Sequence, residues 1–213
     1  MYTKERRGGA VKETLRRLSR MQGLLQVMAV AYLAPMLLAA NLVVAGAPGF
    51  RELQAKTEAR VVQAEPIATI ARFLGERRLP AAIALTFAWN FGAAACLAST
   101  AAGVLFPLPP LVGALRGFLI GVMFAGRLRL LSLHGLVMGG TFLLEIGAYI
   151  LAGALGMRVG LALLPRRGEA PPLRVRLAEP LTDLRYLLPV VALLLLLGAI
   201  WENAGLFLLW RPS

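Results

Sequence analysis

Two acids and two amides lie deep within apolar stretches of this sequence, and they are the residues best placed to do chemistry. Glu145 and Glu202 each lie inside a long apolar stretch, and an asparagine follows the second acid directly. A charged side chain near the middle of a bilayer costs about 2.5 to 3.5 kcal/mol, so such residues usually face other helices and have partners. We therefore predict an intramembrane polar cluster. Its members are Asn90, Glu145, Glu202 and Asn203.

Two roles fit this polar cluster. Two buried acids can form a pathway for protons or cations. Alternatively, neutral acids can hydrogen-bond the asparagines between helices, which is a structural role. We favour the structural role and keep the pathway as the alternative.

The remaining polar residues of the apolar stretches predict neither catalysis nor metal binding. Arg116 lies a few residues inside its stretch, and we expect its guanidinium to extend to the membrane interface. His134 has no second His, Cys or carboxylate at ligand spacing, and Cys96 is the single cysteine, so we predict no metal site and no disulfide. Nucleophile-elbow, Walker, Rossmann and metalloprotease patterns are absent. We expect no enzymatic activity and no cofactor.

The composition indicates an integral membrane protein. The chain has 213 residues, of which 58% are hydrophobic and only 16% charged, and its mean hydropathy is +0.70. A soluble domain of this size has more polar surface. The net charge of +12 would suggest nucleic acid in a soluble protein. Here the bases lie beside apolar stretches, which favours anionic lipid headgroups and excludes nucleic acid as the expected partner.

Five apolar stretches are long enough to cross the roughly 30 Å of hydrocarbon in a bilayer. We predict an all-α polytopic transmembrane bundle, formed as a single domain by residues 24–213 after a basic segment, residues 1–23. The first stretch is longer than the apolar part of a signal peptide, which predicts a retained anchor. The fourth is longer than the bilayer core, so it must tilt, break near Gly139 and Gly140, or protrude. The predicted spans are residues 24–47, 81–106, 111–131, 133–164 and 187–210.

Basic residues predict the orientation of the chain in the plasma membrane. The N-terminal segment and the loop after the fourth span are rich in arginine, so both are expected in the cytoplasm. The segment 51–80 also carries bases, which weakens this bias. Glu52 and Lys56 lie four apart, and an apolar stripe runs from Ile67 to Leu74. We predict interfacial amphipathic helices here, which lie on the membrane or dock a partner protein.

Small residues recur at a spacing of four in the third and fourth spans. That spacing places them on one face of a helix, and small residues let helices in lipid approach backbone to backbone. We predict that these faces pack the bundle or a homo-oligomer. The residues are Gly113, Gly117, Gly121, Ala152, Gly156 and Gly160.

Three stretches resemble the stage II sporulation protein M family of five-span membrane proteins. The first is residues 87–90 (Phe-Ala-Trp-Asn), followed by a proline-rich reversal and the glycine-bearing third span. The second is residues 145–148 (Glu-Ile-Gly-Ala) with the small residues that follow, and the third is residues 199–203 (Ala-Ile-Trp-Glu-Asn). The chain departs from the family at Thr141 and Phe142, where many members have a His-Gly pair.

The resemblance implies a non-enzymatic membrane subunit that packs with or anchors partner proteins of the membrane or the cell envelope. In spore formers, the family's namesake works with peptidoglycan-degrading partners. The alternative function is a transporter or channel component that uses Glu145 and Glu202 as an ion or proton pathway. That alternative requires a polar cavity that reaches both acids.

Overall fold

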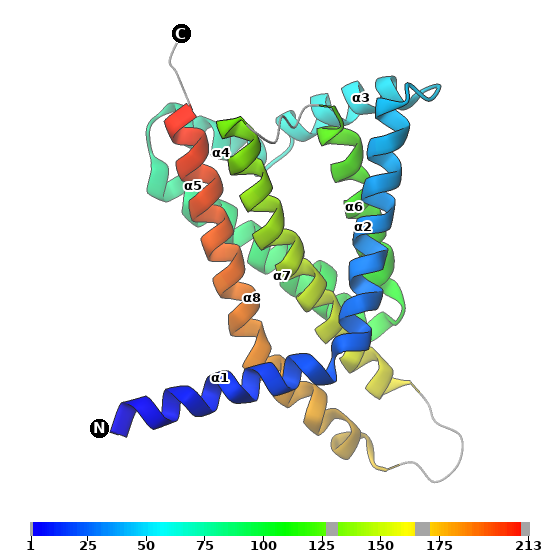
Figure 1. Cartoon of the computed structure of the whole chain (residues 1–213), viewed down its shortest axis with the longest axis vertical. Coiled ribbons are helices and arrows are strands. Elements are labelled where there is room, and N and C mark those ends of the chain that lie inside the picture. Colours follow the sequence, from blue (N-terminus) through cyan, green and yellow to red (C-terminus); the bar gives the residue numbers. More distant parts are fainter. Residues whose placement is uncertain (1, 127–131, 165–170, 210–213) are drawn as a thin grey trace.

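The computed structural model describes residues 2–126, 132–164 and 171–209, and these residues form a bundle of helices (Figure 1). The elements are α1 (Tyr2–Arg20), α2 (Gln22–Val44), α3 (Phe50–Gln63), α4 (Ile67–Gly75), α5 (Leu79–Ala88), η1 (Trp89–Thr100), η2 (Ala101–Leu105), α6 (Leu108–Phe124), α7 (Leu133–Leu163) and α8 (Leu173–Leu209). The predicted end of the third span, residues 127–131, lies outside the described residues, as do Arg166, Arg167 and Trp210.

The helices agree with the predicted all-α polytopic bundle. Within the described residues, four helical segments are long and apolar enough to cross a membrane, namely α2, Leu79–Leu105, α7 and α8. The helix α6 is also apolar but has 17 residues, which is the short limit for a membrane-spanning helix. The helix α8 begins at Leu173, so it contains both the last predicted span and a preceding segment.

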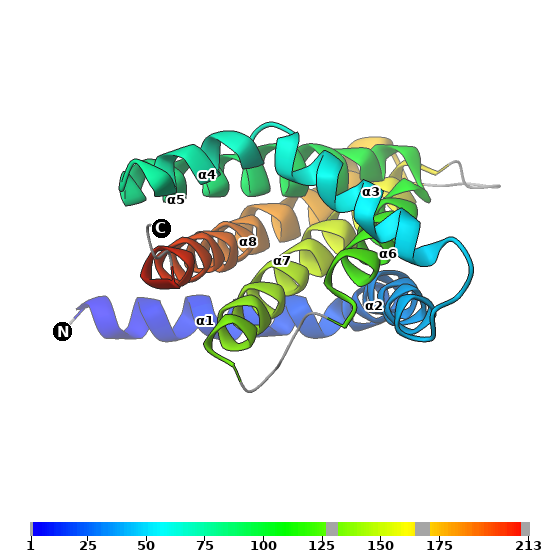
Figure 2. The ribbon, with the colours of Figure 1, turned by 90° about the horizontal axis from the view of Figure 1, so that it is seen from above.

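Helix α7 lies at the centre of the bundle. It packs mainly against α8 and also contacts α2, η1 and η2, while α2 packs mainly against α6. Figure 2 shows α7 between α8 and the α2–α6 pair. Residues 151–157 of α7 are all buried, and a helix that is buried around its whole circumference belongs in the core.

Two helical segments lie across opposite ends of the bundle (Figure 1). The basic helix α1 crosses the end at which α2 begins, and α3 and α4 lie at the end where α2 finishes. On α1, Val11 and Leu15 are exposed, whereas Leu18 packs against the core. The apolar stripe of α1 therefore faces partly away from the protein, as expected of an interfacial helix.

Helix α7 continues without a break through Gly139 and Gly140. Of the three outcomes left open for the long fourth span, a break near these glycines is therefore wrong. The ring nitrogen of Trp201, on α8, donates to the backbone oxygen of Val137 at 2.9 Å. A Cβ atom on Gly140 would lie 2.3 Å from that nitrogen. The glycine therefore makes room for an interhelical indole, and the helix around it stays regular.

The glycines of α6 face α2 at very short range. An added Cβ on Gly117 would lie 2.0 Å from the backbone oxygen of Tyr32, and one on Gly121 would lie 2.1 Å from that of Met36. An added Cβ on Gly113 would lie 3.3 Å from the side chain of Met28 and 3.7 Å from that of Tyr32, on the same helix. Only residues without a Cβ allow this approach, so the α6 face is occupied within a single chain.

The small residues of α7 lie against the segment η1–η2. An added Cβ on Gly156 would lie 2.6 Å from the backbone oxygen of Ser99, and one on Gly160 would lie 2.0 Å from that of Gly103. Ala152 is fully buried, and its backbone oxygen accepts a hydrogen bond from Thr100 Oγ1 at 3.2 Å. This face also makes its contacts within the chain.

Candidate functional site

The four polar residues singled out in the sequence line one cavity of about 460 Å³. Its walls come from elements far apart in the chain: α5 and the start of η1, α7, α8, the end of α6, and the α3–α4 segment. We call it the acidic cavity. The lining residues are Val61, Val62, Pro66, Ile67, Ile70, Ala71, Leu74, Thr86, Trp89, Asn90, Met123, Phe124, Glu145, Glu202, Asn203 and Leu206.

Glu145 reaches the cavity from the middle of α7 and has one hydrogen-bond donor. Asn90 Nδ2 donates to Glu145 Oε1 at 2.6 Å across the interface between η1 and α7. On the side of α8, Gly198 leaves space for the acid, because an added Cβ there would lie 3.2 Å from Glu145 Cγ. The amide and the carboxyl group thus form one of the interhelical contacts expected from the sequence.

Asn203 has a different partner from the predicted one. Its Nδ2 donates to Thr86 Oγ1 at 3.0 Å and to the backbone oxygen of Ala199 at 2.8 Å, whereas no hydrogen bond joins it to either acid within the described residues. The side chain is 1% exposed, and its Oδ1 atom is buried without a hydrogen-bond partner. Thr86 is a functional residue that was missed in the sequence, although a threonine in an apolar stretch is a signal that could have found it.

Glu202 lies on α8 next to Asn203 and interacts electrostatically with Glu145. Within the described residues, no hydrogen bond or ion pair joins its carboxyl group to another side chain. The structure therefore brings two acids to one cavity, of which one has an amide donor and the other has none. Such a pair can hold a proton or attract a cation.

The segment α3–α4 covers the acidic cavity at one end of the bundle. The apolar stripe of α4, from Ile67 to Leu74, lines the cavity, and Leu74 is 3% exposed. Gln54 Nε2, on α3, donates to the backbone oxygens of Met123 and Ala125 at the end of α6, both at 3.2 Å. These contacts attach a polar helix to the bundle and place an apolar helix over the acids.

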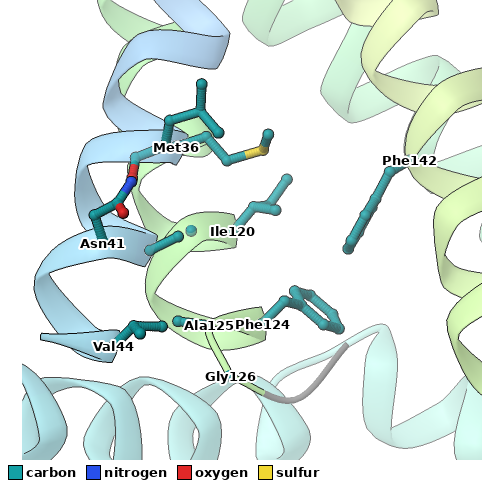
Figure 3. Close-up of a pocket in the computed structure, with 11 residues that line it drawn as sticks. Met36, Asn41, Val44, Ile120, Phe124, Ala125, Gly126 and Phe142 are labelled. Atoms are coloured by element: carbon teal, nitrogen blue, oxygen red, sulfur yellow. The ribbon is translucent and has the colours of Figure 1, made fainter. Parts of the chain in front are cut away.

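An apolar pocket of about 250 Å³ adjoins the acidic cavity between α2, α6 and α7 (Figure 3). Phe124 lines both spaces. Its ring packs edge-to-face against Phe142 with the centroids 4.8 Å apart. Asn41 also lines the pocket, but its amide donates to Leu37 in its own helix. Phe124 is therefore part of the wall of both spaces.

Arg116 turns inward, in contrast to the prediction that it extends to the membrane interface. Its Nη1 donates to the backbone oxygen of Ala94 at 3.2 Å and to Ser99 Oγ at 3.4 Å. Its guanidinium also lies over the ring of Tyr149, 4.9 Å from the centroid. The small residues of η1 and the aromatic face of α7 provide these partners, which the sequence alone cannot place beside α6.

A buried acid at the other end of the bundle was missed in the sequence. Asp183, on α8, is 0% exposed and pairs with Arg17 at 2.5 Å and with Arg158. Arg17 also pairs with Glu13 on its own helix. A hydrogen bond from Arg16 lowers the pKa of Glu13 below its ordinary value. Arg17 and Arg158 are therefore both paired with acids.

Glu179 extends this ionic cluster one helical turn along α8. It pairs with Arg20 at 3.0 Å and with Arg158 at 3.2 Å. The spacing of four between Glu179 and Asp183 puts both acids on one face of the helix, and that spacing is the signal in the sequence that could have found the cluster. The ion pairs connect α1 with α7 and α8, so they are best explained as structural.

The family model for stage II sporulation protein M matches residues 25–204. The matched range runs from α2 to the part of α8 that carries Glu202 and Asn203, so it contains every polar residue of the acidic cavity. No curated protein matches the chain, and no solved structure matches it. Because the family match extends over most of its length, the chain belongs to the stage II sporulation protein M family, as the resemblance in its sequence implies.

Proposed function

We propose that this protein is a non-enzymatic subunit of the plasma membrane that assembles with other membrane or envelope proteins through the outer face of α3–α4. One observation carries the proposal. None of the residues of α3 is buried, yet the helix is attached to the bundle by Gln54. A helix that is held in place while its outer surface stays free is suited to protein docking.

The charges of α3 support docking by a polar partner. Arg51, Lys56 and Arg60 are all exposed, and the one ion pair of Lys56 within the described residues is with Glu52 of its own helix, at 2.6 Å. Such an exposed pair contributes little to folding. These bases are therefore available to an acidic surface on a partner protein.

The end of the molecule that carries α3–α4 is a better candidate for partner binding than the small-residue faces of α6 and α7. The glycines of α6 already contact α2, and those of α7 contact η1 and η2. A second chain cannot use the same surfaces without separating the bundle.

We further propose that α1 lies in the cytoplasm and α3–α4 on the opposite side, since α1 carries the basic N-terminal segment.

Charge reversal on α3 tests the docking proposal without disturbing the cavity. A photo-reactive residue at position 55, on exposed α3, should cross-link the full-length protein to a specific partner in native membranes. The double variant Lys56→Glu, Arg60→Glu should abolish that cross-link, because both bases lie on α3 outside the bundle. Lys12→Glu on α1 is the matched control and should leave it intact. A cross-link that survives the double variant would contradict the proposal.

The second candidate function is a transporter or channel component, and the acidic cavity is the observation that favours it. A cavity lined by Glu145 and Glu202 is what an ion or proton pathway requires. Reconstituted protein should then mediate flux of protons or small cations, and Glu145→Gln or Glu202→Gln should abolish it. Equal flux of protons and small cations in liposomes that contain the native protein and in liposomes that contain these variants would exclude the pathway.

A further inference from the structure

We propose that the acidic cavity binds a small organic cation, an amine whose ammonium group contacts Glu202 and Asn203 and whose apolar part contacts α4 and Phe124. This inference deepens the second candidate function, on whose cavity it rests. It does not require flux, because a membrane subunit can bind a ligand without transporting it.

The charged residues of the cavity wall favour a positively charged ligand. Among the described residues, the lining includes two acids and no base. Arg116 interacts electrostatically with Glu145, but its guanidinium hydrogen-bonds to Ala94 and Ser99 and does not line the cavity. The carboxyl group of Glu202 has no ion-pair partner within the described part of the chain. A positively charged ligand would supply the missing partner.

An orphaned acceptor independently indicates a hydrogen-bond donor in the cavity. Asn203 is 1% exposed, lines the cavity, and has an Oδ1 atom without a partner. The orientation of its amide is fixed, because the backbone oxygen of Ala199 can only accept and so must face the Nδ2 atom, 2.8 Å away. A buried acceptor without a donor is destabilising, because it has lost its hydrogen bonds to water. An ammonium group has N–H donors for this oxygen and for a carboxylate.

The size and lining of the cavity favour an organic cation over a bare metal ion. Its volume of about 460 Å³ lies in the range of about 300 to 1,000 Å³ typical of small-molecule sites. Most of the wall is apolar, and the rings of Trp89 and Phe124 can stack against a cation or an apolar group. Within the described residues, no group of three acids, histidines or cysteines can hold a metal. A hard metal ion needs more oxygen ligands than this wall offers.

A matched pair of probes separates charge recognition from simple apolar binding. Benzylammonium and benzyl alcohol have nearly the same size, but only the first carries a positive charge. We expect the purified full-length protein, in a non-ionic detergent, to bind benzylammonium saturably in isothermal titration calorimetry. Benzyl alcohol should show no saturable binding. Equal binding of the two probes would overturn the proposal.

Side-chain variants then locate the bound cation. Glu202→Gln keeps the shape of the side chain and removes its charge, and should weaken benzylammonium binding by about tenfold or more. Asn203→Ala should also weaken it. Asn41→Ala is the matched control, because that amide bonds within its own helix and does not line the acidic cavity, and it should bind as the native protein does. Binding that is unchanged by Glu202→Gln would overturn the assignment.

Two further measurements keep the result unambiguous. Circular dichroism of each variant checks that it is folded, and Glu145→Gln gives a second folded test because its amide oxygen can still accept from Asn90. Displacement of benzylammonium by sodium chloride but not by choline chloride, at equal ionic strength, would indicate an inorganic ion site and overturn the amine proposal. Binding without flux in liposomes would contradict only the transport function, whereas flux by a native protein that does not bind benzylammonium would contradict this inference alone.

Discussion

The buried acid Asp183 offers the sharpest prediction, because two arginines depend on it. The change Asp183→Asn keeps the size of the side chain and removes its charge. It leaves Arg17 of α1 and Arg158 of α7 without their shared carboxylate. We expect this single substitution to destabilise the end of the bundle where α1, α7 and α8 meet.

The expected cost follows from the exposure of the three side chains. The side chain of Asp183 is 1% exposed, that of Arg17 10% and that of Arg158 19%. Removing one partner of a buried ion pair costs about 3 to 5 kcal/mol. Both arginines keep some contact with water, so we expect the lower end, about 3 kcal/mol. This corresponds to a change of about a hundredfold in the unfolding equilibrium.

A matched control lies one turn away on the same helix. Glu179 pairs with Arg20 and Arg158, but its side chain is 57% exposed. Exposed ion pairs contribute about 0 to 1 kcal/mol, so Glu179→Gln should change the free energy of unfolding by less than Asp183→Asn. The assay is equilibrium unfolding of the full chain in mixed micelles, followed by circular dichroism. Trypsin cleavage within α1 should also become faster in Asp183→Asn alone.

The outcome that would refute the reasoning is a free energy of unfolding for Asp183→Asn no lower than that for Glu179→Gln. A second variant checks the cause. Adding Arg17→Met to Asp183→Asn removes one of the two charges that have lost the buried carboxylate, and should recover part of the lost stability. Further destabilisation by Arg17→Met would mean that other interactions of the arginine, such as its packing and its pair with Glu13, dominate.

Three other predictions concern the bundle and its cover. Gly117→Ala should lower the midpoint of thermal unfolding by several degrees, because the new Cβ would lie 2.0 Å from the backbone of α2. Gly139→Ala is the control and should not lower the midpoint, because a Cβ atom at Gly139 would have no other atom within 4 Å. Asn90→Ala should lower the free energy of unfolding by about 1 to 3 kcal/mol in the same assay, since it leaves the carboxyl group of Glu145 without its donor. An unchanged free energy of unfolding would show that this hydrogen bond contributes nothing to stability. Gln54→Ala should speed hydrogen exchange in α3 but not in α7, and equal protection in both proteins would show that other contacts hold the cover.

Much of the fold was predictable because its signals are local. Runs of apolar residues require helices in a bilayer, since every backbone hydrogen bond must then be made within the segment. The same argument placed Asn90, Glu145, Glu202 and Asn203 in the protein interior, because polar groups in lipid need partners. These are properties of short windows of sequence. By contrast, η1 is a π-helix, which is wider than an α-helix. No short window of the sequence predicts this change of winding.

The partners of the polar residues were not predictable, because they depend on which helices lie side by side. Asn203 bonds Thr86, 117 positions away along the chain. Arg17 pairs with Asp183 at a separation of 166. The inward course of Arg116 depends likewise on η1 packing against α6. No periodicity in the sequence encodes such pairings.

The sequence by itself determined that this is a helical membrane protein with two deep acids, because hydropathy and the cost of burying charge act residue by residue. Only the tertiary structure decided that both acids line one cavity, that α4 covers it, and that the glycine faces are used within the chain. The physical reason is that close packing and hydrogen bonding act over a few ångströms between segments distant in sequence. Those contacts exist only once the helices have assembled.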